Sequence, residues 1–280
     1  MEKKSWVCTI SIQLLLCFVL YCAINIHQPQ KTNNGDEIYF ITLRGGFRPF
    51  KQQTRLLKQI EKVMNTYKVG FVININELGE DDPLLQNATQ YFRSSKVPWY
   101  IISQNTCQPI CFFDGLYTTT ALRGEEPDYV FNISSERMLD IIAINTRKTQ
   151  DPLSDKGKVD LKGLSRKLDS LSGNSNWHIA AGFHPLFCNQ TQSNGNGVLH
   201  QMLLKHGVDV YLSGQPCANE ARIGGPYLTT ITQESYPPKE MVNMFLLHRV
   251  SPLEIVTYRV SFKGDMIHES TVRQRGREMM

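Results

Sequence analysis

The sequence predicts an α/β domain that is preceded by one N-terminal transmembrane helix. Three observations predict it: a long uncharged stretch near the start, an alternation of strand-like and helix-like segments from residue 37 onward, and a closing β-hairpin pattern. The 280 residues are 41% hydrophobic, 10% aromatic and 20% charged, which excludes a disordered or low-complexity chain. A formal net charge of +4 is too small to indicate a nucleic-acid partner, and no internal repeat indicates a solenoid or propeller.

The N-terminal segment 6–26 contains no charged side chain and follows Lys3 and Lys4. About 20 apolar residues cross a hydrocarbon core of about 30 Å. We therefore predict a cytoplasmic tail at 1–5, a signal anchor at 6–26, a polar linker at 27–36 and an ectodomain at 37–280, in a single-pass type II membrane protein. The alternative is a cleaved signal peptide and a secreted protein, although Tyr21-Cys22-Ala23 supplies only one small residue for cleavage. Both interpretations place residues 27–280 in the secretory pathway, luminal or extracellular.

Glycosylation triplets and cysteines agree with that compartment. The triplets begin at Asn87, Asn132 and Asn189, and we expect a glycoprotein. Three of the seven cysteines, Cys8, Cys17 and Cys22, lie in the membrane segment, and four lie in the ectodomain: Cys107, Cys111, Cys188 and Cys217. Four cysteines permit two disulfides with three connectivities, and buried free thiols are the alternative.

The first half of the ectodomain reads as strand, helix, strand, strand. Residues 37–42 form an apolar strand, and after the loop at 44–46 a helix follows with one apolar stripe and ends before Gly70. Residues 71–75 and 98–102 are the next two strands, and each ends in polar residues. The helix stripe comprises Leu56, Leu57, Ile60, Val63 and Met64.

The second half repeats this order. We expect strands at 138–144, 177–181 and 208–212, with helices between them, and a hairpin of 254–262 with 266–272 around a turn at 263–265. The first of these helices carries Leu161, Leu164, Leu168 and Leu171, and the second carries Leu199, Met202 and Leu203 and stops at Gly207. In such α/β sheets functional side chains lie on loops at the carboxyl ends of the strands.

Several stretches around these strand ends resemble one family. They are Val97-Pro98-Trp99-Tyr100, the run Ala180 to Pro185, the run Val208 to Gly214, and the hairpin strand Val256 to Gly264. In order and spacing, residues 37–277 resemble the calcineurin-like metallophosphoesterases, closest to the single-domain tartrate-resistant purple acid phosphatases. The resemblance implies a two-sheet β-sandwich flanked by helices.

The resemblance also implies where two bridged metal ions would be bound and shows those positions largely changed. Of seven ligand positions one keeps its residue, Asn105, and one becomes a similar acid, Glu77; Phe183 has no lone pair, and Arg44 places a cation where a cation should bind. The position of the family's catalytic histidine is Thr106. The seven degenerate positions are Arg44, Glu77, Glu80, Asn105, Phe183, Gln215 and Cys217.

We therefore expect no catalytic residue and no cofactor. The expected function is that of a membrane-anchored pseudophosphatase, a purple-acid-phosphatase-like ectodomain that binds a protein or an anionic ligand. The alternative is a phosphoric-ester hydrolase with a remodelled site for one divalent metal, held by Gln215 and Cys217 with His184 or Glu80. The sequence contains no other catalytic motif: it lacks G-x-S-x-G, a P-loop, His-Glu-x-x-His and C-x-x-C.

Two structural expectations follow from the resemblance. Arg44 should pair with Glu77, or with Glu80, so that a guanidinium stands where a metal stood; the alternative is that Arg44 points into solvent. A disulfide should link loops of the former cleft, with Cys107–Cys217 as first choice and Cys188–Cys217 as second.

Overall fold

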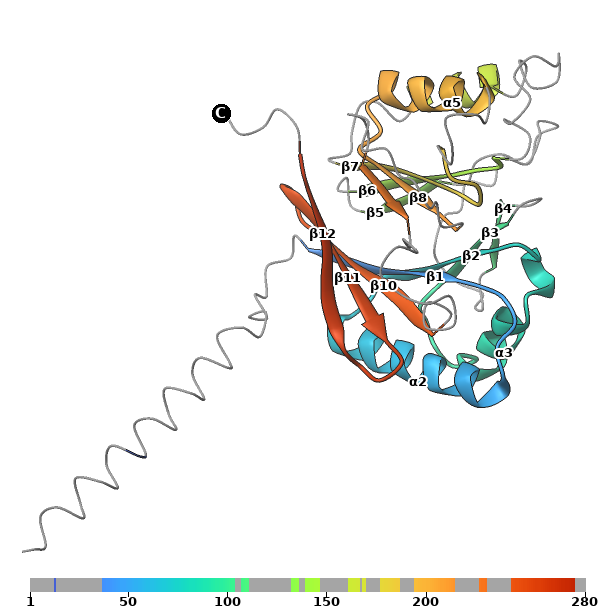
Figure 1. The fold of residues 1–280 in the computed structure, drawn as a ribbon, viewed down its shortest axis with the longest axis vertical. Helices are drawn as coiled ribbons and strands as arrows, with labels where there is room; N and C mark the ends of the chain where they lie inside the picture. The colour runs from blue at the N-terminus through green and yellow to red at the C-terminus, as the bar shows by residue number, and fades with distance from the viewer. Residues whose placement is uncertain are drawn as a thin grey trace, which may run out of the picture. The chain divides into compact units, whose positions relative to one another are not determined.

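The computed structural model describes Gln13 and ten stretches between residues 37 and 274 (Figure 1). Contacts divide the chain into two units at Asp36/Glu37, and the description below concerns the second. The stretches are 37–103, 107–110, 132–135, 139–146, 161–166, 168–169, 177–186, 194–214, 227–230 and 243–274.

Two β-sheets form the centre of this unit. The seven-stranded sheet has the order β12-β11-β10-β1-β2-β3-β4, in which β1, β2 and β3 are parallel and the remaining pairs are antiparallel. Its strands are β1 (Ile38–Arg44), β2 (Phe71–Asn76), β3 (Trp99–Ser103), β4 (Cys107–Ile110), β10 (Met244–Val250), β11 (Glu254–Ser261) and β12 (Met266–Arg273).

The five-stranded sheet has the order β5-β6-β7-β8-β9, and its last four strands are parallel. Its strands are β5 (Asn132–Ser135), β6 (Leu139–Ile144), β7 (Trp177–Gly182), β8 (Val210–Ser213) and β9 (Tyr227–Thr230). Parallel strands require crossover connections, and the helical residues 161–166 and 168–169 and α5 (Asn194–Lys205) lie in those connections.

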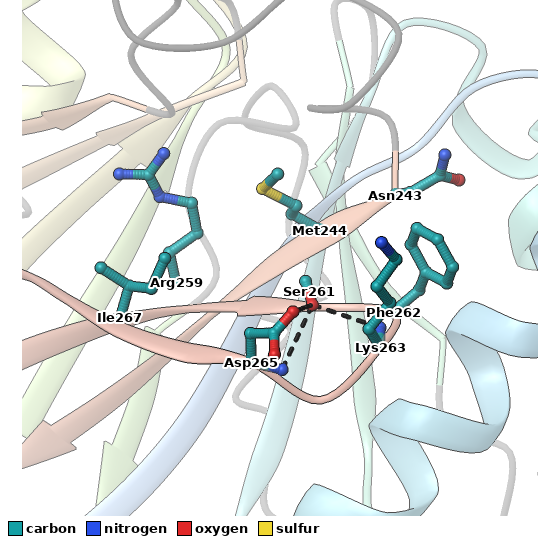
Figure 2. A pocket seen from close by; sticks show the side chains of 8 residues that line it. All are labelled: Asn243, Met244, Arg259, Ser261, Phe262, Lys263, Asp265 and Ile267. Atoms are coloured by element: carbon teal, nitrogen blue, oxygen red, sulfur yellow. Dashed lines mark hydrogen bonds between the residues drawn. The ribbon is translucent and has the colours of Figure 1, made fainter.

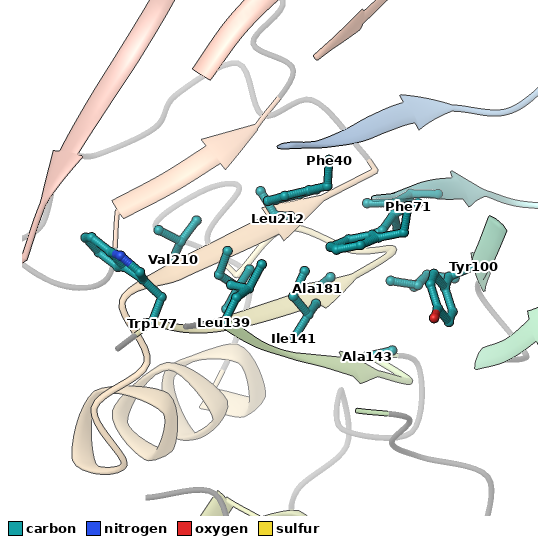
Figure 3. Close-up of a cluster of buried hydrophobic side chains, with 14 of the residues drawn as sticks. Phe40, Phe71, Tyr100, Leu139, Ile141, Ala143, Trp177, Ala181, Val210 and Leu212 are labelled. Atoms are coloured by element: carbon teal, nitrogen blue, oxygen red, sulfur yellow. The ribbon is translucent and has the colours of Figure 1, made fainter. Parts of the chain in front are cut away.

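One core joins the two sheets. Phe40, Phe71 and Tyr100 of the first sheet share a buried cluster with side chains of β6, β7 and β8 (Figure 3). The Trp177 indole N–H donates to the carbonyl of Ser251, 2.6 Å away, and so attaches β7 to the turn between β10 and β11. The unit is thus a mixed α/β structure with two packed sheets flanked by helices, as the resemblance implied.

A second core lies on the outer face of the seven-stranded sheet, under α2 (Phe50–Tyr67) and α3 (Pro83–Tyr91). All five apolar residues predicted for the α2 stripe are buried there. The helix ends at Tyr67, and its C-cap Lys68 adopts the left-handed conformation and donates its N–H to the carbonyl of Met64, so the helix ends before Gly70 as predicted. A short 3₁₀ turn (Gly79–Asp81) precedes α3.

A buried histidine occupies the inner face of the seven-stranded sheet. His248 of β10 is hydrogen-bonded through Nε2 to Thr42 (2.8 Å) and through Nδ1 to Thr257 (3.0 Å), and its ring stacks on Phe40. Complete burial lowers the pKa of His248 to about 3, so the imidazole is neutral at physiological pH.

The predicted strands and the C-terminal hairpin are present, with shifts of one or two residues at some ends. The sequence patterns did not indicate α3, β4, β5, β9 or β10. The predicted anchor lies outside the described residues apart from Gln13, as does Leu171. Among the residues that are described, no helix is long and apolar enough to span a bilayer.

Candidate functional site

The carboxyl ends of β1 and β2 in one sheet lie close to those of β7 and β8 in the other. A Cβ atom added to Gly214, which follows β8, would stand 2.3 Å from Cγ2 of Ile75 on β2 and 3.5 Å from the ring of Phe183, which follows β7. Only glycine fits at this approach, because real contacts of a Cβ atom are never this short. The resemblance places ligand positions at these strand ends, so this junction is the candidate site.

The junction is filled by an apolar plug, by which we mean Ile75, Phe183 and Gly214. Phe183 is 4% exposed and Ile75 is 3% exposed, and both belong to the core between the sheets. Beside the plug, the Ser213 hydroxyl donates to the carbonyl of Phe183 (3.5 Å). The side chains of the plug offer no lone pair, so this part of the junction does not fit a metal ion.

His184, next to Phe183, is held by neighbouring polar groups. Its Nδ1 is hydrogen-bonded to the Thr146 hydroxyl (2.8 Å), and its backbone N–H donates to the same oxygen (3.1 Å). The Tyr211 hydroxyl donates to the carbonyl of His184 (2.6 Å). A ring nitrogen engaged in this way supports a structural role for His184, which fixes the loop after β7.

The expected pair of Arg44 with Glu77 or Glu80 is not formed. Arg44 is half-buried at the end of β1, whereas Glu77 and Glu80 are exposed beyond the end of β2. Among the described residues no ion pair joins Arg44 to either acid. The prediction was wrong because the chain turns outward after Asn76. The Asn76 side-chain amide donates to the carbonyl of Gly79 (3.1 Å) and accepts from the N–H of Gly79. This turn directs Glu77 and Glu80 to solvent.

A different cation and acid are buried at this edge, Arg48 and Asp82. Arg48 is 1% exposed and donates to the carbonyls of Gly46 (3.0 Å) and Arg44 (2.5 Å). Burial lowers the pKa of Arg48 to about 10, and the nearby Asp82 carboxylate opposes that decrease.

Asp82 connects the two loops. It is fully buried, caps α3 by accepting from the N–H of Leu85 (3.0 Å), and accepts from the N–H of Gly46. A Cβ atom on Gly45 would stand 2.5 Å from an Asp82 oxygen, so the loop after β1 packs directly on the acid. Arg48 and Asp82 were not predicted from the sequence, although an aspartate before a proline, as in Asp82-Pro83, is a typical N-cap signal.

Asn74, two residues before the end of β2, differs from the other buried polar residues of this edge in its hydrogen bonding. It is fully buried, and neither its amide nitrogen nor its amide oxygen has a hydrogen-bond partner among the described residues. An unsatisfied buried amide of this kind destabilises a fold.

Within the described ranges no three His, Cys, Asp or Glu side chains are grouped so that they could hold a metal. Asn105, Thr106, Gln215 and Cys217 lie outside the described residues. Of Cys107 only the backbone is described, at the start of β4, and Cys111 and Cys188 are not described, so both disulfide pairings stay predictions.

The predicted glycosylation positions differ in their setting. Asn87 lies within α3, is half-buried, and donates from its side-chain nitrogen to the buried Gln53. Asn132 begins β5 at the edge of its sheet, and Asn189 lies outside the described residues.

A hollow of about 380 Å³ lies where β10, β11 and β12 meet the end of β1 (Figure 2). The register Thr42↔Leu246 places Met244 beside the strand end that carries Arg44. Arg259 in its wall donates to Glu269 (2.8 Å), and the Lys263 ammonium lies 6.0 Å from the Phe262 ring centre. The wall therefore combines apolar surface with Lys263, with an arginine that is paired with Glu269, and with the acid Asp265, which accepts from the Ser261 hydroxyl (3.0 Å). It is lined by Asn243, Met244, Arg259, Ser261, Phe262, Lys263, Asp265 and Ile267.

No protein-family description matches the chain, and no curated protein sequence matches it. Among solved structures it is similar to GAP50, the anchor in the inner membrane complex of Plasmodium, with a TM-score of 0.59 at 15% identity, over 87% of this chain and 90% of that chain. It overlaps more weakly with a predicted phosphoesterase from Streptococcus pneumoniae (TM-score 0.37, 11% identity, 86% of this chain and 99% of that one). A phosphatase from Mycoplasma pneumoniae gives a TM-score of 0.39 at 11% identity, over 86% of this chain and 96% of that one. The described fold is thus similar to that of GAP50.

Proposed function

We propose that this protein is a non-catalytic, membrane-anchored binding domain built on a metallophosphoesterase-like fold. The observation that carries the proposal is the apolar plug of Ile75, Phe183 and Gly214 at the junction of the sheets. A two-metal phosphoesterase site needs a cluster of oxygen and nitrogen ligands around a water-accessible space. The side chains of the plug are apolar and carry no oxygen or nitrogen atom.

The charges next to the plug support the same interpretation. A carboxylate remaining in a site without metals needs another cation, because an unpaired buried charge is costly. Asp82 lies near the buried Arg48 guanidinium, which supplies that cation from the protein itself. The resemblance suggested that the Arg44 guanidinium replaces a metal ion beside Glu77. We now propose that the Arg48 guanidinium takes this role beside Asp82.

Binding would then use surfaces at the same edge. The hollow beside the end of β1 is the place that we propose for a small amphipathic anion, because its wall presents Lys263 next to Phe262 and Met244. The fold shared with GAP50, described as a membrane-complex anchor, agrees with a tethering role for this chain.

The test is the metal content of the purified full chain together with its turnover of an aryl phosphate across pH. We expect strongly substoichiometric metal and no turnover above a heat-treated control. Phe183→His, which restores a ligand type at that position, should still bind no metal, because the surrounding plug remains. One metal per chain, with activity that is lost in Cys217→Ala or Gln215→Ala, would instead establish the single-metal hydrolase.

A further inference from the structure

The outermost ridge of α2 carries only cations. Lys51, Arg55, Lys58 and Lys62 are all exposed, and their spacings of four, three and four residues place them on one line of the helix. That line is opposite the buried stripe, which packs on the outer face of the seven-stranded sheet (Figure 1). We call these four side chains the cationic ridge.

Nothing among the described residues neutralises the cationic ridge. None of its four members forms an ion pair with a described residue. The one acid of α2, Glu61, lies at the side of the ridge and accepts a hydrogen bond from the Tyr91 hydroxyl (2.7 Å).

The stability of the helix does not account for the cationic ridge. Lys51 and Arg55 lie near the N-terminus of α2, where the helix dipole disfavours positive charge, and like charges three or four residues apart repel one another. The first turn contains no acidic residue to offset them, and Pro49 at the N-cap offers no side-chain hydrogen bond. An arrangement that costs helix stability indicates a surface that binds something negative.

Two phenylalanines stand at the N-terminal end of the cationic ridge. Phe47 is 79% exposed and Phe50 is 72% exposed. They flank Arg48, whose buried guanidinium bonds to the carbonyls of Gly46 and Arg44 and so fixes the loop. These hydrogen bonds hold the loop backbone, so less entropy is lost when the two exposed phenylalanines bind a surface.

We infer that the cationic ridge with Phe47 and Phe50 docks on an anionic phospholipid surface. Exposed aromatic side chains enter the headgroup boundary while lysine and arginine contact lipid phosphates and carboxylates. The contact surface is the convex outside of a helix, which a fluid, nearly planar bilayer can meet without a matching groove. An acidic protein would neutralise the cations equally well, but it would leave the two phenylalanines without an apolar environment unless it also supplied a pocket for them.

The proposed anchor bears on this inference, which in that respect rests on the proposed function: it keeps the domain beside a bilayer, and docking requires anionic lipid in the leaflet on the side of the domain. A linker of ten residues (27–36) spans at most about 35 Å, so a bilayer that holds residues 6–26 is always within reach of the domain. Docking is then an intramolecular event, and a weak contact is sufficient for it.

The experiment places the full chain in nanodiscs of phosphatidylcholine alone or of phosphatidylcholine with phosphatidylserine. Hydroxyl-radical oxidation of Phe47 and Phe50 is read by mass spectrometry, and Leu253, 65% exposed on the turn between β10 and β11, is the internal reference. We expect oxidation of both phenylalanines to fall several-fold on the anionic nanodiscs and oxidation of Leu253 to stay unchanged. The protection should disappear near 1 M salt, where the screening length is about 3 Å.

Two quadruple variants that lose the same positive charge distinguish binding by the cationic ridge from attraction by the net charge of the protein. Lys51→Gln, Arg55→Gln, Lys58→Gln and Lys62→Gln together should abolish the protection. Arg93→Gln, Lys96→Gln, Lys162→Gln and Lys205→Gln, all at exposed positions elsewhere, should retain it.

Equal oxidation on both nanodiscs, or equal behaviour of the two quadruple variants, would overturn the inference. Protection that arises only when poly-glutamate is added to the neutral nanodiscs would also overturn it and would identify an acidic protein as the partner. Failure of the anchor is seen separately, as release of every variant from the nanodiscs in alkaline carbonate.

Discussion

The two strand edges that meet at the candidate site differ in the chemical character of their buried side chains. The edge of β7 and β8 is closed by apolar contact, with Phe183 buried and Gly214 against Ile75. The edge of β1 and β2 is held by charged and polar groups, with Arg48, Asp82 and Asn76 all buried. The difference shows that two strand edges of one junction can be stabilised in different ways: one edge is packed with hydrocarbon, and the other buries charged and polar groups that bond to the loop backbone.

The largest expected effect tests the charged edge. Asp82→Ala removes the cap of α3 and the carboxylate that accepts from the N–H of Gly46, which should together cost about 3 kcal/mol. The thermal midpoint of the full chain should fall by roughly 10 °C. Asp81→Ala, one residue away and exposed, is the matched control and should change the midpoint by about 1 °C at most. Arg48→Met measured alone and together with Asp82→Ala gives the coupling between the two charges. If the double variant loses as much stability as the two single variants summed, the charges are not coupled.

The second effect concerns His248 in the core between the sheets. Its pKa is about 3 in the folded chain and 6.5 in the unfolded chain, so the unfolded state binds more protons over that range. The stability that the neutral histidine contributes is complete above pH 6.5 and is lost as the pH falls toward 3, by roughly 1 kcal/mol per pH unit. Unfolding by urea between pH 7 and pH 4 measures this slope. His248→Gln keeps a polar partner for Thr42 and Thr257 and should flatten the profile; an unchanged profile would exclude His248 as its source.

A smaller effect tests the apolar edge. Gly214→Ala places a methyl group 2.3 Å from Cγ2 of Ile75, and such overpacking costs about 1–3 kcal/mol. Ile75→Leu lacks that branch atom and should restore part of the loss in the double variant. Gly163→Ala is the control, because its new methyl group meets no described atom within 4 Å. A Gly214→Ala chain as stable as the native one would show that the two edges do not touch.

The smallest effect has the opposite sign. Asn74→Leu removes two buried amide atoms that have no hydrogen-bond partner among the described residues, and it should raise stability by about 1 kcal/mol. The thermal midpoint would rise by about 2–4 °C. A decrease would instead indicate that Asn74 has a partner, such as an ordered water, in solution.

Much of the fold could be predicted because its periodicities are strong. The α2 stripe and the strands that end at the site are apolar runs between clear breakers. β10 was missed because Met244–Val250 is a short apolar run without alternation, which periodicity cannot distinguish from a helix segment. α3 was not predicted because its N-cap, Asp82, follows other polar residues after β2, and the proline that comes next is also common in loops.

The candidate site was predictable in its location and only partly in its chemistry. Strand order placed Arg44 and Phe183 at strand ends, where the structure has them. The choice between Glu77 and Asp82 as the buried acid depends on the turn made by Asn76 and Gly79, and Gly79 adopts a positive φ there. No spacing rule gives the direction of that turn.

The interlocked plug also limits how this lineage can change. A single substitution such as Phe183→His would place a polar ring against Ile75 before any second ligand existed, so it would lose packing without gaining metal affinity. Several positions would have to change together, and each intermediate would be less stable than the present chain. The close approach of Gly214 to Ile75 therefore favours compensated change: a substitution in the plug is tolerated only when its neighbour changes with it.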